Sequence, residues 1–132
     1  MVNYLSWKDE YSVSAQVLDS QHKQIFAIIN ELYNCVRNNS ANIPGDIVRM
    51  RVFSESHLNS EEVYQKYAKY PGLEEHKKIH AEFVAKLNTL LEQFFANQVS
   101  GDELLIFLKD WWKNHVISED RKYVEYVKKL GM

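Results

Sequence analysis

HLNSEEVYQKYAKYPGLEEHKKIH, at residues 57–80, is the stretch that decides the fold. On both sides of Pro71-Gly72, the histidines, one glutamate and the apolar side chains recur together at intervals of three and four residues. This period follows one face of an α-helix, and proline next to glycine is typical of a break between helices. The stretch therefore predicts the end of one helix, a tight connection and the start of the next.

The same period extends in both directions from this stretch. Apolar side chains recur in four segments, which are 18–36, 47–64 after a break at Pro44-Gly45, 73–94, and 104–112 after Gly101. Each segment is long enough for an amphipathic helix. We predict an all-α protein, an up-down-up-down four-helix bundle. An N-terminal arm to about Val17 and a short C-terminal helix around residues 123–127 complete it.

Composition limits the classes of partner. The chain has 132 residues, 45% of them hydrophobic, so we expect one domain spanning 1–132. The formal charge is −2 with interspersed signs, which excludes the clustered basic face that nucleic-acid binding needs. No apolar run is long enough for a membrane span, and no secretory leader is visible. We expect a cytoplasmic monomer.

Six polar side chains fall on the apolar period: His22, His57, Glu61, His76, His80 and His115. A lone core histidine is more often structural than a ligand, and one HxxxH pair is a weak signal. Chain direction alternates in an up-down bundle, however, so these six side chains come to the same end of the bundle. Burying them unpaired would cost on the order of 1–3 kcal/mol for each neutral group. A bound metal would offset that cost.

Two further carboxylates, which follow His115 and Glu61 in the sequence, are harder to place. Asp120 lies five residues after His115, an offset of roughly 140° on a regular helix, so both can serve one site only if the helix widens or ends between them. Spacing alone leaves Asp120 as a surface carboxylate. Glu62, one residue round the helix from Glu61, is predicted to point away from the core.

The chain resembles the hemerythrins, specifically the single-domain bacterial members. The matching segments are Trp7 with Tyr11-Ser12-Val13, Asp19-x-Gln21-His22-Lys23, His57-x-x-x-Glu61-Glu62, Tyr70-Pro71, His76-x-x-x-His80-x-x-Phe83, Trp111-x-x-x-His115 and Asp120-x-x-Tyr123. The resemblance implies that Asp120 is a ligand and that the cofactor is two iron ions with an oxo or hydroxo bridge. His76, His80 and His115 would hold one iron, His22 and His57 the other, and Glu61 and Asp120 would bridge them.

The function that the resemblance implies is reversible dioxygen binding, for oxygen storage, delivery or sensing, and not enzymatic turnover. The implied ligands give one bond fewer than two octahedral ions need, and the open position falls on the iron held by His22 and His57. Trp112, Leu58 and Tyr123 are the residues expected at the oxygen pocket. Leu58 replaces a common aromatic residue, Trp112 replaces the usual leucine, and Tyr64-Gln65 replaces the usual Leu-Met pair.

Three alternatives remain open. One is a di-iron oxidase or peroxidase, although no glutamate stands three residues before any histidine, as it does in ferritin-like enzymes. A second is a module that senses oxygen or nitric oxide and, because the chain ends just beyond the last helix, acts in trans. A third is a zinc protein, for which seven ligands are too many for one tetrahedral ion.

Overall fold

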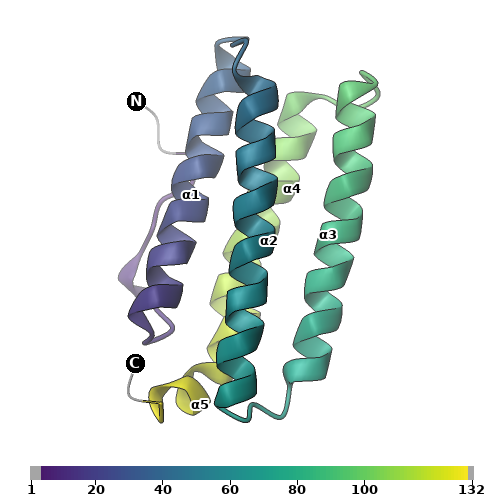
Figure 1. Cartoon of the computed structure of the whole chain (residues 1–132). Helices are drawn as coiled ribbons and strands as arrows, with labels where there is room; N and C mark the ends of the chain where they lie inside the picture. Colours follow the sequence, from purple (N-terminus) through teal and green to yellow (C-terminus); the bar gives the residue numbers. More distant parts are fainter. Residues whose placement is uncertain (1–3, 131–132) are drawn as a thin grey trace.

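The computed structural model describes residues 4–130, and all regular structure within that range is helical. Four long helices form an up-down-up-down bundle (Figure 1), as the sequence predicted. Their bounds are α1 (Gln16–Arg37), α2 (Ile43–Tyr67), α3 (Leu73–Phe95) and α4 (Gly101–Asn114). The chain continues from α4 through η2 (His115–Glu119) and η3 (Asp120–Tyr123) to the short helix α5 (Val124–Lys128).

The helix boundaries differ from the predicted ones at one place. Pro44 and Gly45 belong to the first turn of α2, and the break after α1 lies at residues 38–42. Proline is tolerated in a first turn because its missing N–H has no partner there in any case, and its fixed φ already suits a helix. Gly72 does precede α3 directly, as its N-cap residue. At the start of α4, Ser100 accepts a hydrogen bond from the backbone N–H of Glu103 (3.1 Å).

The described part of the predicted N-terminal arm, residues 4–15, runs along α1 (Figure 1), and its first three residues lie outside the described range. It includes a short 3-10 turn, η1 (Asp9–Tyr11), and buries Tyr11 and Val13 against the bundle. Backbone groups of Leu5 exchange two hydrogen bonds with the Asn30 side chain (2.7 and 2.8 Å). Arg121 donates to the carbonyl of Glu10 (2.7 Å), which ties the arm to η3.

Two apolar clusters fill the interior. The larger one runs along most of the bundle and includes Ile25, Leu58, Phe83 and Trp112. The smaller one closes the end near α5 and comprises Val13, Ala15, Leu18, Tyr123 and Val127. The start of α1, the end of α2, the start of α3 and the segment after α4 all lie at that end (Figure 1). In sequence, His22 stands between Leu18 of the smaller cluster and Ile25 of the larger one, and Asp120 stands between Val116 of the larger cluster and Tyr123 of the smaller one. Among the described residues, no helix is both long and apolar enough to cross a membrane.

Candidate metal centre

The structure brings all seven predicted ligand residues together in the interior. Each is buried, with at most 3% of its surface exposed. They come from α1, α2 and α3 and from the η2 and η3 turns after α4, so the alternation of chain direction does place them at one level. The residues are His22, His57, Glu61, His76, His80, His115 and Asp120.

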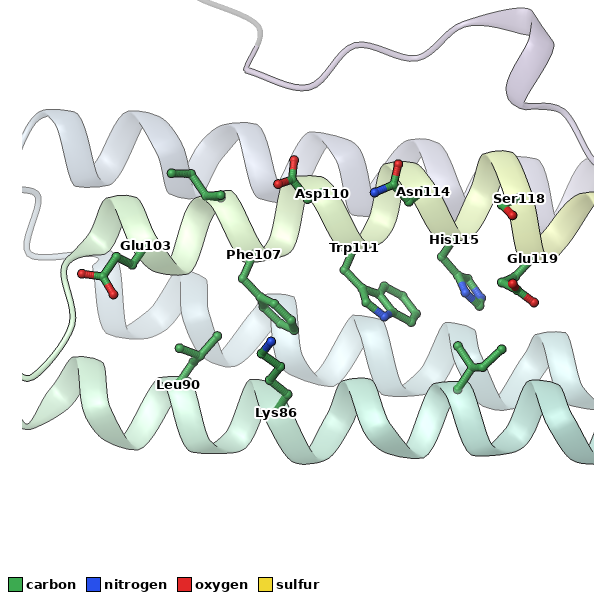
Figure 2. A pocket seen from close by; sticks show the side chains of 12 residues that line it. Lys86, Leu90, Glu103, Phe107, Asp110, Trp111, Asn114, His115, Ser118 and Glu119 are labelled. Carbon is green, nitrogen blue, oxygen red and sulfur yellow. The ribbon is translucent and has the colours of Figure 1, made fainter.

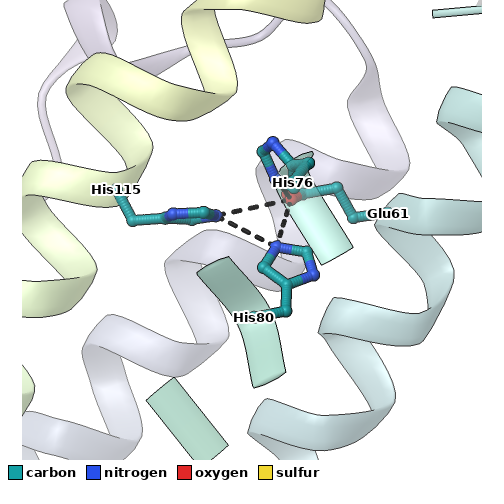
Figure 3. A group of neighbouring side chains, drawn as sticks. All are labelled: Glu61, His76, His80 and His115. Atoms are coloured by element: carbon teal, nitrogen blue, oxygen red, sulfur yellow. Dashed lines mark hydrogen bonds and ion pairs between the residues drawn. The ribbon is translucent and has the colours of Figure 1, made fainter. Parts of the chain in front are cut away.

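Three imidazoles form one group around Oε1 of Glu61 (Figure 3). Nε2 of His76 lies 2.6 Å from that oxygen, Nε2 of His80 lies 3.1 Å from it, and Nε2 of His115 lies 3.6 Å from it. Nε2 of His80 and Nε2 of His115 are 3.1 Å apart. All three rings thus turn the same nitrogen toward a common point.

Two imidazoles form a second group around the other oxygen of the same carboxylate. Nε2 of His57 is 3.3 Å, and Nε2 of His22 is 3.5 Å, from Oε2 of Glu61. The two rings meet edge to face with centroids 4.5 Å apart. This group offers one imidazole fewer than the first.

Asp120 repeats the division that Glu61 makes. Its Oδ1 lies 3.0 Å from Nε2 of His115 and 3.2 Å from Nε2 of His76, whereas its Oδ2 lies 3.2 Å from Nε2 of His22. Each carboxylate therefore turns one oxygen toward the three-imidazole group and the other toward the two-imidazole group. This is the arrangement that a carboxylate needs to bridge two ions.

A widened helical turn explains how Asp120 joins His115. Residues His115–Glu119 form a π-helix, in which hydrogen bonds connect residues five apart. The widening brings two residues five positions apart onto the same side of the chain, where a regular helix would separate them. A helix that widens between His115 and Asp120 is one of the two conditions given above for both residues to serve one site. π-turns of this kind are frequent at functional sites.

Two hydrogen bonds at the outward-facing ring nitrogens of ligand histidines were not predicted from the sequence. Nδ1 of His57 donates to Oε1 of Gln21 (2.7 Å), and Nδ1 of His80 donates to Oε2 of Glu62 (2.7 Å). The expectation that Glu62 points away from the centre is therefore wrong, because its side chain extends across to α3. Each contact orients an imidazole so that Nε2 faces inward. Two signals were available: both residues directly adjoin a predicted ligand, and both belong to segments that match the family.

The electrostatics of the cluster favour a bound cation. Burial lowers the pKa of an imidazole, but Asp120 and Glu61 outweigh it and raise the pKa of His22 and of His76 to about 9. The same two carboxylates raise the pKa of His115 to about 10. Burial raises the pKa of both carboxyl groups, yet the surrounding imidazoles hold both below their ordinary values. At His57, by contrast, burial lowers the pKa. Positive charge is thus stabilised where the imidazoles meet both carboxylates and not at every histidine of the cluster.

The donor atoms also fit a metal better than they fit one another. Both ring nitrogens of His22, Nε2 of His57 and both carboxylate oxygens of Asp120 are buried without a hydrogen-bond partner. Their neighbours are close, but the directions do not make hydrogen bonds. Imidazole nitrogen and carboxylate oxygen are ligands that suit iron and zinc. Two groups of donors, joined by two shared carboxylates, fit two ions.

The residues predicted for an oxygen pocket lie on different sides of the cluster. Trp112 is fully buried, and its ring centroid is 5.7 Å from that of His57. Leu58 is buried in the larger apolar cluster. Tyr123 belongs to the smaller cluster, and its hydroxyl donates to Oε2 of Glu61 (3.1 Å).

A surface groove lies between α3 and α4 (Figure 2). It encloses about 630 Å³, and Phe107, Trp111 and His115 are among its lining residues. The ring of Trp111 stacks on that of His115, with centroids 4.3 Å apart and planes 13° apart. The groove thus borders the outer side of the three-imidazole group.

The family model for the hemerythrin HHE cation binding domain matches residues 13–127. The chain belongs to the hemerythrin family. A bacteriohemerythrin of Pseudomonas aeruginosa is 32% identical over 126 residues, covering 95% of this chain and 82% of that protein. A bacteriohemerythrin of Clostridium acetobutylicum is 29% identical, covering 90% of this chain and 98% of that protein. A myohemerythrin of Riftia pachyptila is 34% identical over 118 residues, covering 89% of this chain and 88% of that protein.

Solved hemerythrin structures share the fold. A crystal structure of a hemerythrin point mutant superposes with a TM-score of 0.86 at 24% identity, covering 96% of this chain and 98% of that one. The resemblance to hemerythrins expected from the sequence is therefore confirmed for the family and for the bundle.

Proposed function

We propose that this hemerythrin-family chain binds dioxygen reversibly at a non-haem di-iron centre. The ligands are His76, His80 and His115 on one ion, His22 and His57 on the other, with Glu61 and Asp120 shared. The observation that carries the proposal is the position of the carboxylates, each of which faces both imidazole groups with separate oxygens. The relatives named bacteriohemerythrin and myohemerythrin support it.

The asymmetry of the two groups supports a ligand-binding role. The three-imidazole group and the shared carboxylates would give one ion more protein ligands than the two-imidazole group would give the other, which would leave an open position for a small ligand on the second ion. Iron, when bound, supplies reversible electron transfer to dioxygen at that position. The chain's own part is to hold the imidazoles, through Gln21 and Glu62, and to surround the centre with apolar side chains that exclude water.

The test is the optical spectrum of the purified protein, reduced and then exposed to air, with metal content measured on the same sample. We expect two iron ions per chain and a visible absorption change that reverses when oxygen is removed. One zinc ion per chain, or an iron-loaded sample whose spectrum ignores oxygen, would contradict the proposal.

We also propose binding rather than catalysis. The donor set is rich in neutral imidazole and has two carboxylates, so it stabilises high-valent iron less well than a carboxylate-rich site. Hydrogen peroxide supplied with an electron donor should be consumed no faster by iron-loaded protein than by the same iron free in buffer. Sustained turnover that scales with protein concentration would favour the peroxidase alternative.

A further inference from the structure

Trp112 lies against the two-imidazole group in a fixed orientation. Its side chain is fully buried, and its ring is 5.7 Å from His57 at an interplanar angle of 52°. Phe83 and Trp111 hold it edge to face, with centroids 5.5 and 5.0 Å away. Interiors this closely packed leave an indole little freedom to turn.

The indole carries a donor that the protein does not use. Nε1 of Trp112 is buried and has no hydrogen-bond acceptor among residues 4–130. A buried tryptophan N–H usually has a partner, and leaving one unpaired is unfavourable. Such a group would be expected where a ligand supplies the missing acceptor.

A second polar group lies near the same histidine. Ser54 precedes His57 by three residues on the buried face of α2, and its hydroxyl is also buried without a partner. Two helices, α2 and α4, therefore each carry a buried, unpaired hydrogen-bonding group close to His57. The apolar character of the surrounding cluster makes both groups exceptional there.

We propose that the indole N–H of Trp112 donates a hydrogen bond to a small anionic ligand bound on the His57 side of the centre. This inference rests on the proposed function, which leaves the open position on that side. The ligands concerned are those that carry negative charge when bound, such as azide or dioxygen that has accepted electrons. A neutral, apolar molecule of the same size would gain nothing from the donor.

A donor and a steric barrier have different kinetic effects. A barrier slows entry and exit by the same factor, so removing it leaves the dissociation constant unchanged. A donor stabilises the bound state alone, so removing it raises the dissociation rate and the dissociation constant together. The two roles of Trp112 can therefore be measured separately.

Azide binding to the iron-loaded, oxidised protein is the test. Trp112→Phe removes the N–H and keeps an aromatic ring, while Trp112→Leu removes both. We expect both variants to bind azide about tenfold more weakly, as one hydrogen bond to a charged group predicts, through faster dissociation. An unchanged dissociation constant in both variants, with iron content equal to wild type, would overturn the inference.

A second measurement does not depend on the variants. In crystals of the wild-type iron-loaded protein soaked with azide, Nε1 of Trp112 should lie within about 3.2 Å of an azide nitrogen. A separation above about 4 Å would overturn the inference. Wild-type protein that holds no iron would overturn this inference and the proposed function together, whereas oxygen binding with azide far from Trp112 would overturn this inference alone.

Discussion

Glu62 provides the sharpest test of how the centre is held. Its carboxylate accepts a 2.7 Å hydrogen bond from Nδ1 of His80, and its side chain is about one-fifth exposed. Glu62→Gln keeps an acceptor oxygen at that place but removes the charge. Glu62→Ala removes both, so the imidazole of His80 loses the contact that fixes its orientation.

The expected magnitude follows from the role of the contact. Loss of an outer hydrogen bond to a metal-binding histidine typically lowers metal affinity 10–100-fold, or about 1.4–2.7 kcal/mol. Because the amide still accepts, Glu62→Gln should fall near the lower end of that range and Glu62→Ala near the upper end. Glu61→Ala, which removes a shared ligand, should lose more iron than either.

The assay is competition for iron between the protein and a coloured chelator. Glu55→Gln is the matched control, because Glu55 lies two turns earlier on the same face of α2 and, within the part of the chain that the structure describes, pairs only with the exposed Arg51 (3.7 Å). The control should retain iron as the wild type does. If Glu62→Ala retained iron as well as the Glu55 control, the contact with His80 would have no part in holding the metal.

Three further predictions concern access, stability and pH. Trp112→Leu should speed azide association and autoxidation with iron content unchanged, because a smaller side chain opens access to the centre. Stopped-flow association rates equal to wild type would show that Trp112 is no barrier to ligand entry. Iron removal should lower the free energy of unfolding by about 2.7 kcal/mol relative to protein held at a free iron concentration about 100 times the dissociation constant. Calorimetry should show this as a lower Tm. A metal-free form as stable as the iron-loaded form would count against a metal site in the core. The pKa values of His22, His76 and His115 are raised above 6.5, so the stability they contribute is present below about pH 6.5 and is lost as the pH rises through 9 to 10. As the pH rises through this range, the Tm of the metal-free protein should therefore fall more than that of the iron-loaded protein. Parallel curves of Tm against pH for the two forms would refute the raised pKa values of these three histidines.

The sequence predicted the bundle well because its helices depend on a repeated pattern. The period of the apolar residues predicted the four helices, and with them the end of the bundle at which the polar residues lie. It misplaced one break because Pro44-Gly45 was interpreted as a connection. Proline occurs in loops and in first turns alike, and only the backbone around Asn42 distinguishes the two.

The site was predictable where it follows the helical period and not where it departs from it. The six residues on the stripes could be proposed from spacing. Asp120 could not, because no local signal in the sequence announces a π-turn, and the family resemblance alone suggested it. Glu62 was misplaced because angular position describes where a side chain leaves the helix, whereas its long side chain bends across to His80 on α3.

The π-turn makes the backbone conformation of the segment after α4 part of the metal centre. If residues 115–119 formed a regular helix at unchanged length, every later residue would be rotated by about 100° relative to His115. Asp120 would leave its place beside His115, Tyr123 would lose its contact with Glu61, and Arg121 would no longer meet the N-terminal arm. Loss of the π-turn at unchanged length is thus equivalent to three separate lesions, whereas deletion of one residue from Val116–Glu119 together with that loss would leave Asp120 four residues after His115, on the same face of a regular helix.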